Sequence, residues 1–134
     1  MFHFLRRFAF KERPVEPPEL EPGDAPSFNK RGVRHIQEAR PAQARADFDA
    51  ALEHDPNFAP ALMNIGNLAF DGGDAIEAVR WYEAAIAADA EYAMAHMNLA
   101  SAYKKLGRYD DAVRAMHQAR RLEGRRGKKQ SRLL

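Results

Sequence analysis

Residues 59–92 read APALMNIGNLAFDGGDAIEAVRWYEAAIAADAEY, and the segments on either side repeat this pattern. The unit is 34 residues long, so each residue can be compared with the residues one period before and after it. Residues 55–58 (DPNF), which precede the unit, take the same place in the period as residues 89–92 (DAEY) at its end. Three units follow one another, at residues 25–58, 59–92 and 93–124.

Positions one period apart carry side chains of similar size. The small positions include Gly32, Gly66 and Ala100, and the large ones include Phe48, Tyr82 and Met116. Two helices that pack closely need small side chains where their backbones approach and large ones in the remaining space. The pattern predicts two helices per unit, at about residues 27–39 and 41–54, 59–71 and 74–88, and 93–106 and 109–122.

The turn between the two helices is marked by glycine in two of the units. Residues 71–74 read DGGD, where glycine suits a left-handed helix end and Asp74 suits a cap for the next helix. Gly107 takes this place in the last unit. The first unit has no turn glycine, although Pro41 suits the first turn of a following helix.

These positions resemble the tetratricopeptide repeat, whose pattern is W-x2-L-G-x2-Y, then A-x3-F, then A and P. The resemblance implies an all-α fold, a right-handed superhelical stack of three helix-turn-helix hairpins. It also implies a non-catalytic adaptor whose concave face, formed by the first helix of each hairpin, binds a peptide, a helix or a partner subunit. The residues expected on that face are Asn29, Val33, Ile36, Met63, Asn64, Asn67, Phe70, Met94, Met97, Asn98, Ser101, Lys104 and Lys105.

Two residue types in this set favour ligand binding. The methionines, at residues 63, 94 and 97, are flexible and suit apolar or helical ligands, although partly buried packing is the alternative. Asn64 and Asn98 recur one period apart, and amides at this spacing can hydrogen-bond an extended peptide backbone at successive sites. Similar asparagine ladders occur in some peptide-binding members of the family.

Some members of the family grip the carboxylate tail of heat-shock chaperones with a lysine and arginine clamp. Of the positions that carry the clamp, only Asn64 matches here. The other members are replaced by Asn29, Val33, Met94 and Asn98. We therefore do not expect this chain to bind such a tail.

The composition argues against catalysis and cofactors. The chain has no cysteine, which excludes disulfides and thiolate metal sites. It has three serines and no threonine, and no two of its five histidines are three or four residues apart, as a metal-binding pair on one helix face would be. We expect no enzyme activity, no cofactor and no metal.

The N-terminal segment, residues 1–13, is aromatic and basic. It is amphipathic as a helix, although its alternating phenylalanines would suit a strand as well. In either conformation we expect it to dock on a membrane surface or a partner protein. Packing against the chain's own groove, or disorder, is the alternative. The docking residues would be Phe2, Phe4, Leu5, Arg6, Arg7, Phe8 and Phe10. Residues 14–24 carry four prolines and four acids, which favours an extended tether.

The C-terminal end is strongly basic, although the net charge of the whole chain is only +2. Its cations include Arg120, Arg121, Arg125, Arg126, Lys128 and Lys129. Glycines and like charges predict a mobile tail at residues 125–134. Such a tail would attract nucleic acid or anionic lipid, or serve only as a solvated end. The last repeat appears without a polar capping helix, so a homo-oligomer through this end stays open. We expect a cytoplasmic protein, with peripheral attachment at the inner membrane as an open alternative.

Overall fold

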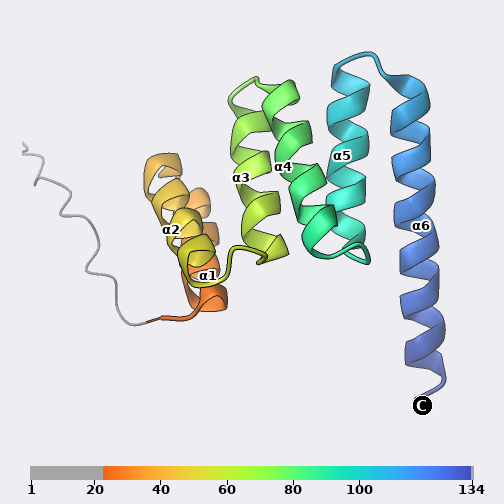
Figure 1. Ribbon diagram of the computed structural model, residues 1–134, viewed down its shortest axis with the longest axis horizontal. Helices are drawn as coiled ribbons and strands as arrows, with labels where there is room; N and C mark the ends of the chain where they lie inside the picture. Colours follow the sequence, from red (N-terminus) through yellow and green to blue (C-terminus); the bar gives the residue numbers. More distant parts are fainter. Residues whose placement is uncertain (1–22, 134) are drawn as a thin grey trace, which may run out of the picture.

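The computed structural model describes residues 23–133 as six α-helices joined by short turns (Figure 1). The helices are α1 (Ala25–Gln37), α2 (Pro41–His54), α3 (Ala59–Asp71), α4 (Ala75–Ala88), α5 (Ala93–Lys105) and α6 (Tyr109–Ser131). No strand occurs among these residues. The predicted all-α class is confirmed, and the first five helices begin and end within about two residues of their predicted bounds.

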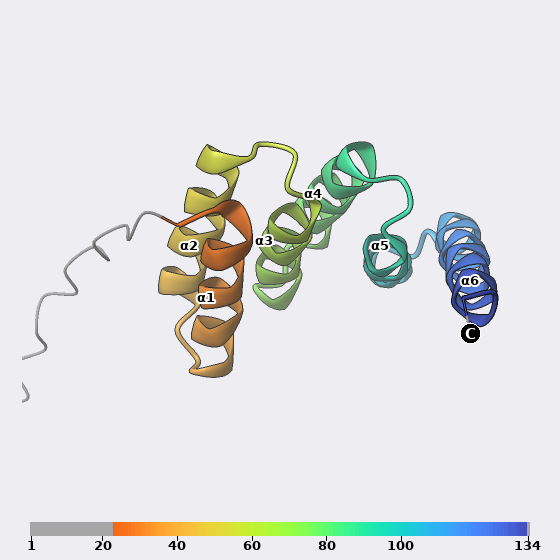
Figure 2. The same ribbon diagram turned by 90° about the horizontal axis from the view of Figure 1, so that it is seen from below.

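The six helices form three antiparallel hairpins that stand side by side (Figures 1 and 2). Each helix contacts the helices before and after it in the chain. The first helices of the hairpins, α1, α3 and α5, also contact one another in succession, whereas no such contact joins α2, α4 and α6 within residues 23–133. The first helices therefore form the inner row of an α-solenoid, and their outward side chains share one face.

Glycine and a large aromatic ring meet inside two of the hairpins. A Cβ atom at Gly66 would lie 2.6 Å from Cε1 of Tyr82, and one at Gly32 would lie 2.4 Å from Cε1 of Phe48. Both rings are buried. The predicted packing of small against large residues is confirmed, because a side chain at either glycine would collide with the ring.

The three hairpin turns use the same left-handed backbone position. Gly73 and Gly107 have φ values of 88° and 76°, and Ala39, at the equivalent place in the first unit, has φ 56°. Asp74 caps α4, because its Oδ1 atom accepts a hydrogen bond from the Glu77 N–H at 3.0 Å. Ala39 reaches a conformation that disfavours a Cβ atom, so the first turn is more strained than the others.

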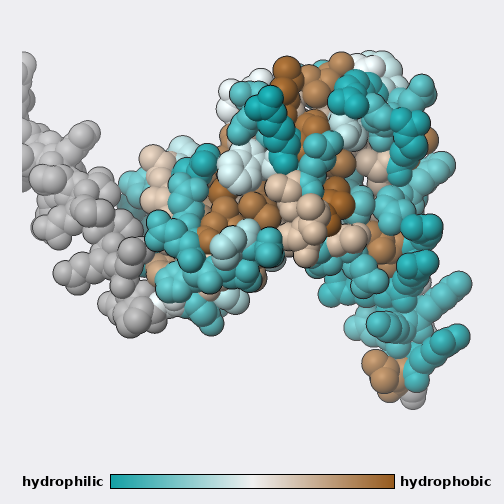
Figure 3. Space-filling model, viewed as in Figure 1, coloured by the Kyte–Doolittle hydropathy of each residue, from teal (hydrophilic) through white to brown (hydrophobic). Residues whose placement is uncertain are grey.

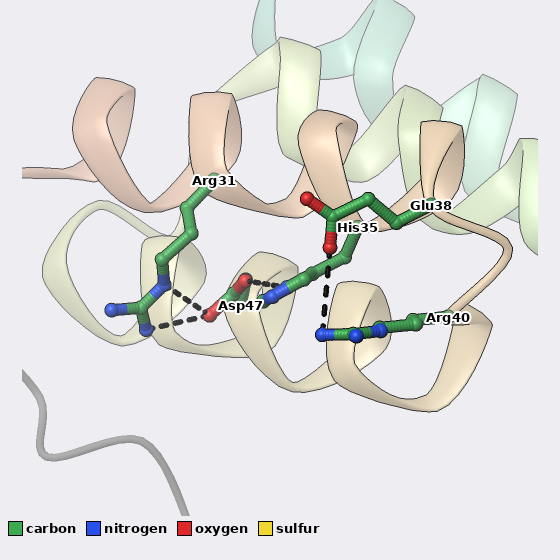
Figure 4. A network of polar contacts seen from close by, with 5 residues as sticks. All are labelled: Arg31, His35, Glu38, Arg40 and Asp47. Carbon is green, nitrogen blue, oxygen red and sulfur yellow. Dashed lines mark hydrogen bonds and ion pairs between the residues drawn. The ribbon is translucent and has the colours of Figure 1, made fainter.

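A buried ion cluster ties α1 to α2 (Figure 4). Arg31 donates from Nε and Nη2 to Oδ1 of Asp47 at 2.9 and 2.6 Å, and Nδ1 of His35 lies 2.7 Å from Asp47 Oδ2. The Asp47 residue has 0% relative exposure. Two basic side chains, Arg31 and His35, compensate the burial of this carboxylate.

The same positions in the middle hairpin are apolar. One period after Arg31, His35 and Asp47 stand Ile65, Ala69 and Trp81. The first hairpin therefore replaces hydrocarbon contacts with charge-assisted hydrogen bonds, which are stronger than neutral ones.

The last helix, α6, is much longer than predicted. It continues without a break to Ser131. The prediction of a mobile tail at residues 125–134 is therefore wrong for residues 125–131, which are helical. Its second half extends past the other helices (Figure 1). Arg, Lys, Gln and Leu are good helix formers, and adding residues to a helix already fixed on α5 avoids the cost of nucleation.

Candidate partner-binding groove

Two pairs of asparagines join successive first helices across the inner face. Asn64 Nδ2 donates to Asn29 Oδ1 at 2.9 Å, and Asn98 Nδ2 donates to Asn67 Oδ1 at 3.0 Å. All four side chains are half-buried. Because an amide carries two N–H donors and a carbonyl acceptor, each pair keeps polar groups for a ligand after bonding to itself.

Tyr82 of α4 also holds the Asn67–Asn98 pair in place. Its hydroxyl donates to Asn67 Oδ1 at 2.7 Å. Burial raises the pKa of Tyr82 to about 12, and the negative charge of Asp71 adds to the effect. The hydroxyl therefore remains a donor at neutral pH, and the Asn67 oxygen is held by both Tyr82 and Asn98.

Three of these asparagines, Asn64, Asn67 and Asn98, line a depression of about 340 Å³ whose surface is both polar and apolar. Its lining includes six predicted groove residues from all three first helices: Val33, Ile36, Asn64, Asn67, Phe70 and Asn98. Phe48, Leu68 and Asp71 complete the lining, and none of the three is in the predicted set given above. For Phe48 a signal was available, since its ring packs on Gly32 of α1.

Met63 was predicted to lie on the concave face, but the structure buries it. Its relative exposure is 8%, and it packs in the same buried cluster as Leu62 and Tyr82. The position equivalent to Met63 in the first repeat holds Asn29 and in the last repeat Met97, which is 42% exposed. The middle repeat buries this position because it has a neighbouring hairpin on both sides.

The remaining predicted residues lie on α5, outside the depression. Met94 and Met97 are exposed large apolar residues, and Ser101, Lys104 and Lys105 are exposed as well. The hydroxyl of Ser101 donates to the Met97 carbonyl, 3.3 Å away, so this serine already has a partner on its own helix. The structure brings the α1 and α3 residues together with Asn98 and leaves the rest of α5 as an open continuation.

A second depression, of about 360 Å³, lies among α4, α5 and α6 and was not predicted. Ile86, Leu99 and Ala115 form its apolar part. At its border, Tyr103 Oη donates to Glu83 Oε1 at 3.0 Å. The border also carries Asp111, whose pKa is lowered chiefly by its hydrogen bond with Arg114. Tyr103 with Glu83, and Asp111 with Arg114, are thus paired within the chain at this border.

The predicted basic residues lie on the exposed surface of α6, where Figure 3 shows a hydrophilic lower half. One subset recurs at helical spacing within about 100° of the circumference: Arg121, Arg125, Lys128, Lys129 and Arg132. Apolar side chains instead gather over the middle of the stack in that view. The cations therefore form one basic face of an ordered helix.

The predicted docking residues between Phe2 and Phe10 lie outside the described residues. Within residues 23–133, no helix combines the length and the apolar character that crossing a membrane requires. In the same part of the chain, no group of three acidic, histidine or cysteine side chains is arranged to hold a metal ion.

Solved structures share this architecture. The crystal structure of MamA aligns with a TM-score of 0.71 and 21% identity, over 78% of this chain and 61% of MamA. The second TPR of Spaghetti (RPAP3), bound to the HSP90 peptide SRMEEVD, aligns with a TM-score of 0.68 and 21% identity, over 73% of this chain and 91% of that one. At this identity the likeness concerns the fold alone.

Sequence relatives and family models agree with the fold. Cellulose synthase 1 operon protein C from Komagataeibacter xylinus is 32% identical over 81 residues, which are 60% of this chain and 6% of the relative. The chain thus spans a small part of that protein. A model described as TPR repeat matches residues 66–107, and one described as Tetratricopeptide repeat matches residues 93–125. With three hairpins of one period, this chain belongs to the tetratricopeptide repeat family.

Proposed function

We propose that the protein is a non-catalytic adaptor that binds a segment of a partner polypeptide across the asparagine groove. The observation that carries the proposal is the pairing of Asn29 with Asn64 and of Asn67 with Asn98 beside a depression that also exposes Val33, Ile36 and Phe70. A bound segment could hydrogen-bond to the amides through its backbone and place alternate side chains on Val33, Ile36 and Phe70.

The chemistry of the groove favours an apolar, extended segment as the ligand. The two asparagine pairs are half-buried, so a bound backbone would meet them partly shielded from water, where hydrogen bonds are stronger. Asp71 is the one ionisable residue in the lining, and it would disfavour an acidic ligand. The solved Spaghetti domain with its HSP90 peptide supports the general mode of binding on this fold. The acidic peptide in that complex differs from the ligand expected here.

The asparagines provide the test. A peptide library is selected against the full chain, and each enriched peptide is then measured against the Asn64→Ala/Asn98→Ala double variant. We expect the double variant to lose at least about tenfold in affinity, since two hydrogen bonds of about 1 kcal/mol each are removed. Asn57→Ala, at an exposed loop asparagine outside the groove, is the control and should bind as the wild type does. Equal binding by the double variant would contradict the proposal.

We also infer a wider role in assembling a larger complex, with residues 1–13 as a second contact at a membrane or membrane protein. The aromatic and basic sequence of that segment is its support. A chain lacking residues 1–13 should lose association with the membrane fraction while keeping its affinity for the selected peptides. Unchanged fractionation would remove this part of the proposal.

A second candidate function is favoured by the basic face of α6. Five cations on one side of a helix would attract a polyanion, either nucleic acid or an anionic membrane. If nucleic acid neutralises all five, the logarithm of the binding constant should fall against the logarithm of salt with a slope of about −4.5. Binding of a fluorescent oligonucleotide across a salt series measures the slope, and a slope near zero would exclude this candidate.

A further inference from the structure

The outer face of the last hairpin is apolar and uncovered within residues 23–133. Val113 is 50% exposed and Met116 is 39% exposed. One period earlier, Val79 and Tyr82 occupy the same positions on α4 with 7% and 2% exposure. Tyr82 also packs on Gly66 within its own hairpin. In addition, α4 is covered by α5, whereas among the described helices α6 contacts α5 alone.

Two glycines in the second half of α6 have no explanation within the hairpin. A Cβ atom at Gly124 or Gly127 would meet no atom within 4 Å, whereas the helical glycines Gly32 and Gly66 lie directly beneath aromatic rings. A glycine inside a helix costs about 1 kcal/mol relative to alanine. Close approach by another chain would account for that cost, because glycine is the residue that permits it.

These features lie on one stripe of α6. The stripe consists of Tyr109, Val113, Met116, Arg120, Gly124, Gly127 and Ser131. Successive members are separated by 4, 3, 4, 4, 3 and 4 residues, so the spacing is the same in both directions. Its first half is large and its second half is small, with Arg120 at the centre. If two such helices pair in opposite directions, the large half of each stripe faces the small half of the other.

We propose that α6 pairs with α6 of a second copy of this chain, antiparallel and about a two-fold axis near Arg120. In this register Met116 packs over Gly124 of the second copy and Val113 over its Gly127, while Tyr109 lies against its Ser131. Large residues meet small ones, as Tyr82 meets Gly66 inside the hairpin. The second copy then covers the face that α5 covers on α4.

Charge selects the antiparallel direction. The first turn of α6 is acidic, with Asp110 and Asp111, and its last turn is basic, with Lys128 and Lys129. Antiparallel pairing places Asp110 beside Lys128 of the second copy and opposes the two helix dipoles. A parallel pair would instead bring the two basic last turns of α6 to the same end of the dimer.

The other end of the stack does not offer an alternative site for the second copy. Where α3 presents Ala61, Ile65 and Leu68 toward the hairpin before it, α1 has Ser27, Arg31 and Arg34. A head-to-tail chain of copies would bury these polar groups against the apolar stripe. A closed dimer through α6 avoids that cost.

Sedimentation of the full chain tests the dimer. We expect a dimer for the wild type and for Ile76→Asp, which alters an exposed residue of α4 as a control. Val113→Asp and the double variant Gly124→Leu/Gly127→Leu should be monomers. The double variant should keep or raise the helix content, because there is open space around both glycines. A monomeric wild type, or a dimer that these variants leave intact, would overturn the proposal.

Engineered cysteines test the register, because the chain has none of its own. Arg120→Cys should form a disulfide-linked dimer with itself under mild oxidation, since residue 120 lies near the axis. Val113→Cys should cross-link only when mixed with Gly127→Cys. A parallel pair would instead cross-link Val113→Cys to itself, and that result would contradict the antiparallel register. Ser27→Cys, at the opposite end of the stack, should give no cross-link.

Discussion

The first and last hairpins are built on one pattern but end the stack in opposite ways. The first ends in polar groups, with Arg31 and His35 held by the buried Asp47. The last ends in an apolar face, with Val113 and Met116 exposed. The first and last hairpins thus share the same internal packing but differ in the side chains on their outer faces. The comparison teaches that the repeat pattern specifies the fold, whereas its departures specify the ends and the sites.

Removing the carboxylate of Asp47 should weaken the packing of α1 on α2 in the first hairpin. Asp47→Ala leaves Arg31 and His35 partly buried without their partner, and we expect a loss of about 3 kcal/mol in the free energy of unfolding. Asp49→Ala removes only an exposed pair with Arg45 and should cost less than about 0.5 kcal/mol. Urea unfolding followed by circular dichroism gives both values. Similar losses in the two variants would show that the cluster does not stabilise the first hairpin.

The same valine truncation should have different effects in the middle and last hairpins. Val79→Ala leaves a cavity in a covered face and should cost about 2 kcal/mol, whereas Val113→Ala removes exposed atoms and should cost less than about 0.5 kcal/mol in the monomer. Thermal unfolding at protein concentrations dilute enough to separate copies measures the difference. Equal costs would contradict the difference in exposure between the two valines.

The hairpin turns offer a smaller comparison between the two ends. Gly107→Ala should cost about 1 kcal/mol, because alanine resists the left-handed backbone that the last turn requires. Ala39→Gly should instead stabilise the first turn by less than about 1 kcal/mol, since glycine also loses more entropy on folding. Urea midpoints compare both variants with the wild type. A destabilised Ala39→Gly variant would contradict the inferred strain.

The middle and last hairpins also differ at the position of Tyr82, which is Met116 in the last hairpin. Tyr82→Phe should cost about 1 kcal/mol at neutral pH through the lost hydrogen bond to Asn67. Burial raises the pKa of Tyr82 to about 12, above its unfolded value near 10. Its neutral form therefore stabilises the fold below about pH 10, and this contribution is lost as the pH rises toward 12. The stability difference between wild type and variant should shrink across that window, and a constant difference would contradict the assignment.

The sequence predicted most of the fold because size alternation and turn glycines act within one hairpin. Gly66 beneath Tyr82 and the left-handed Gly73 follow from local rules. The ion cluster was missed because Asp47 resembles a surface residue until α1 and α2 are placed together. Its signal was present, since Arg31 and His35 are four residues apart and Asp47 shares a position with Trp81.

The groove and the last helix were predicted less completely. Asn64 and Asn98 were selected by their recurrence, but their pairing with Asn29 and Asn67 depends on the offset between neighbouring helices. The end of α6 was misread because glycine and like charge favour a mobile tail in isolation. A helix already anchored on α5 tolerates both.

The side-chain amide signals of the groove asparagines provide the most direct test of partner binding. Each asparagine NH₂ group gives a resolved pair of signals in ¹⁵N spectra of the full chain, and a selected peptide can be titrated in. The account predicts that the signals of Asn29, Asn64, Asn67 and Asn98 shift together while that of Asn57 stays in place. Shifts confined to residues lining the second depression, among α4, α5 and α6, would contradict it.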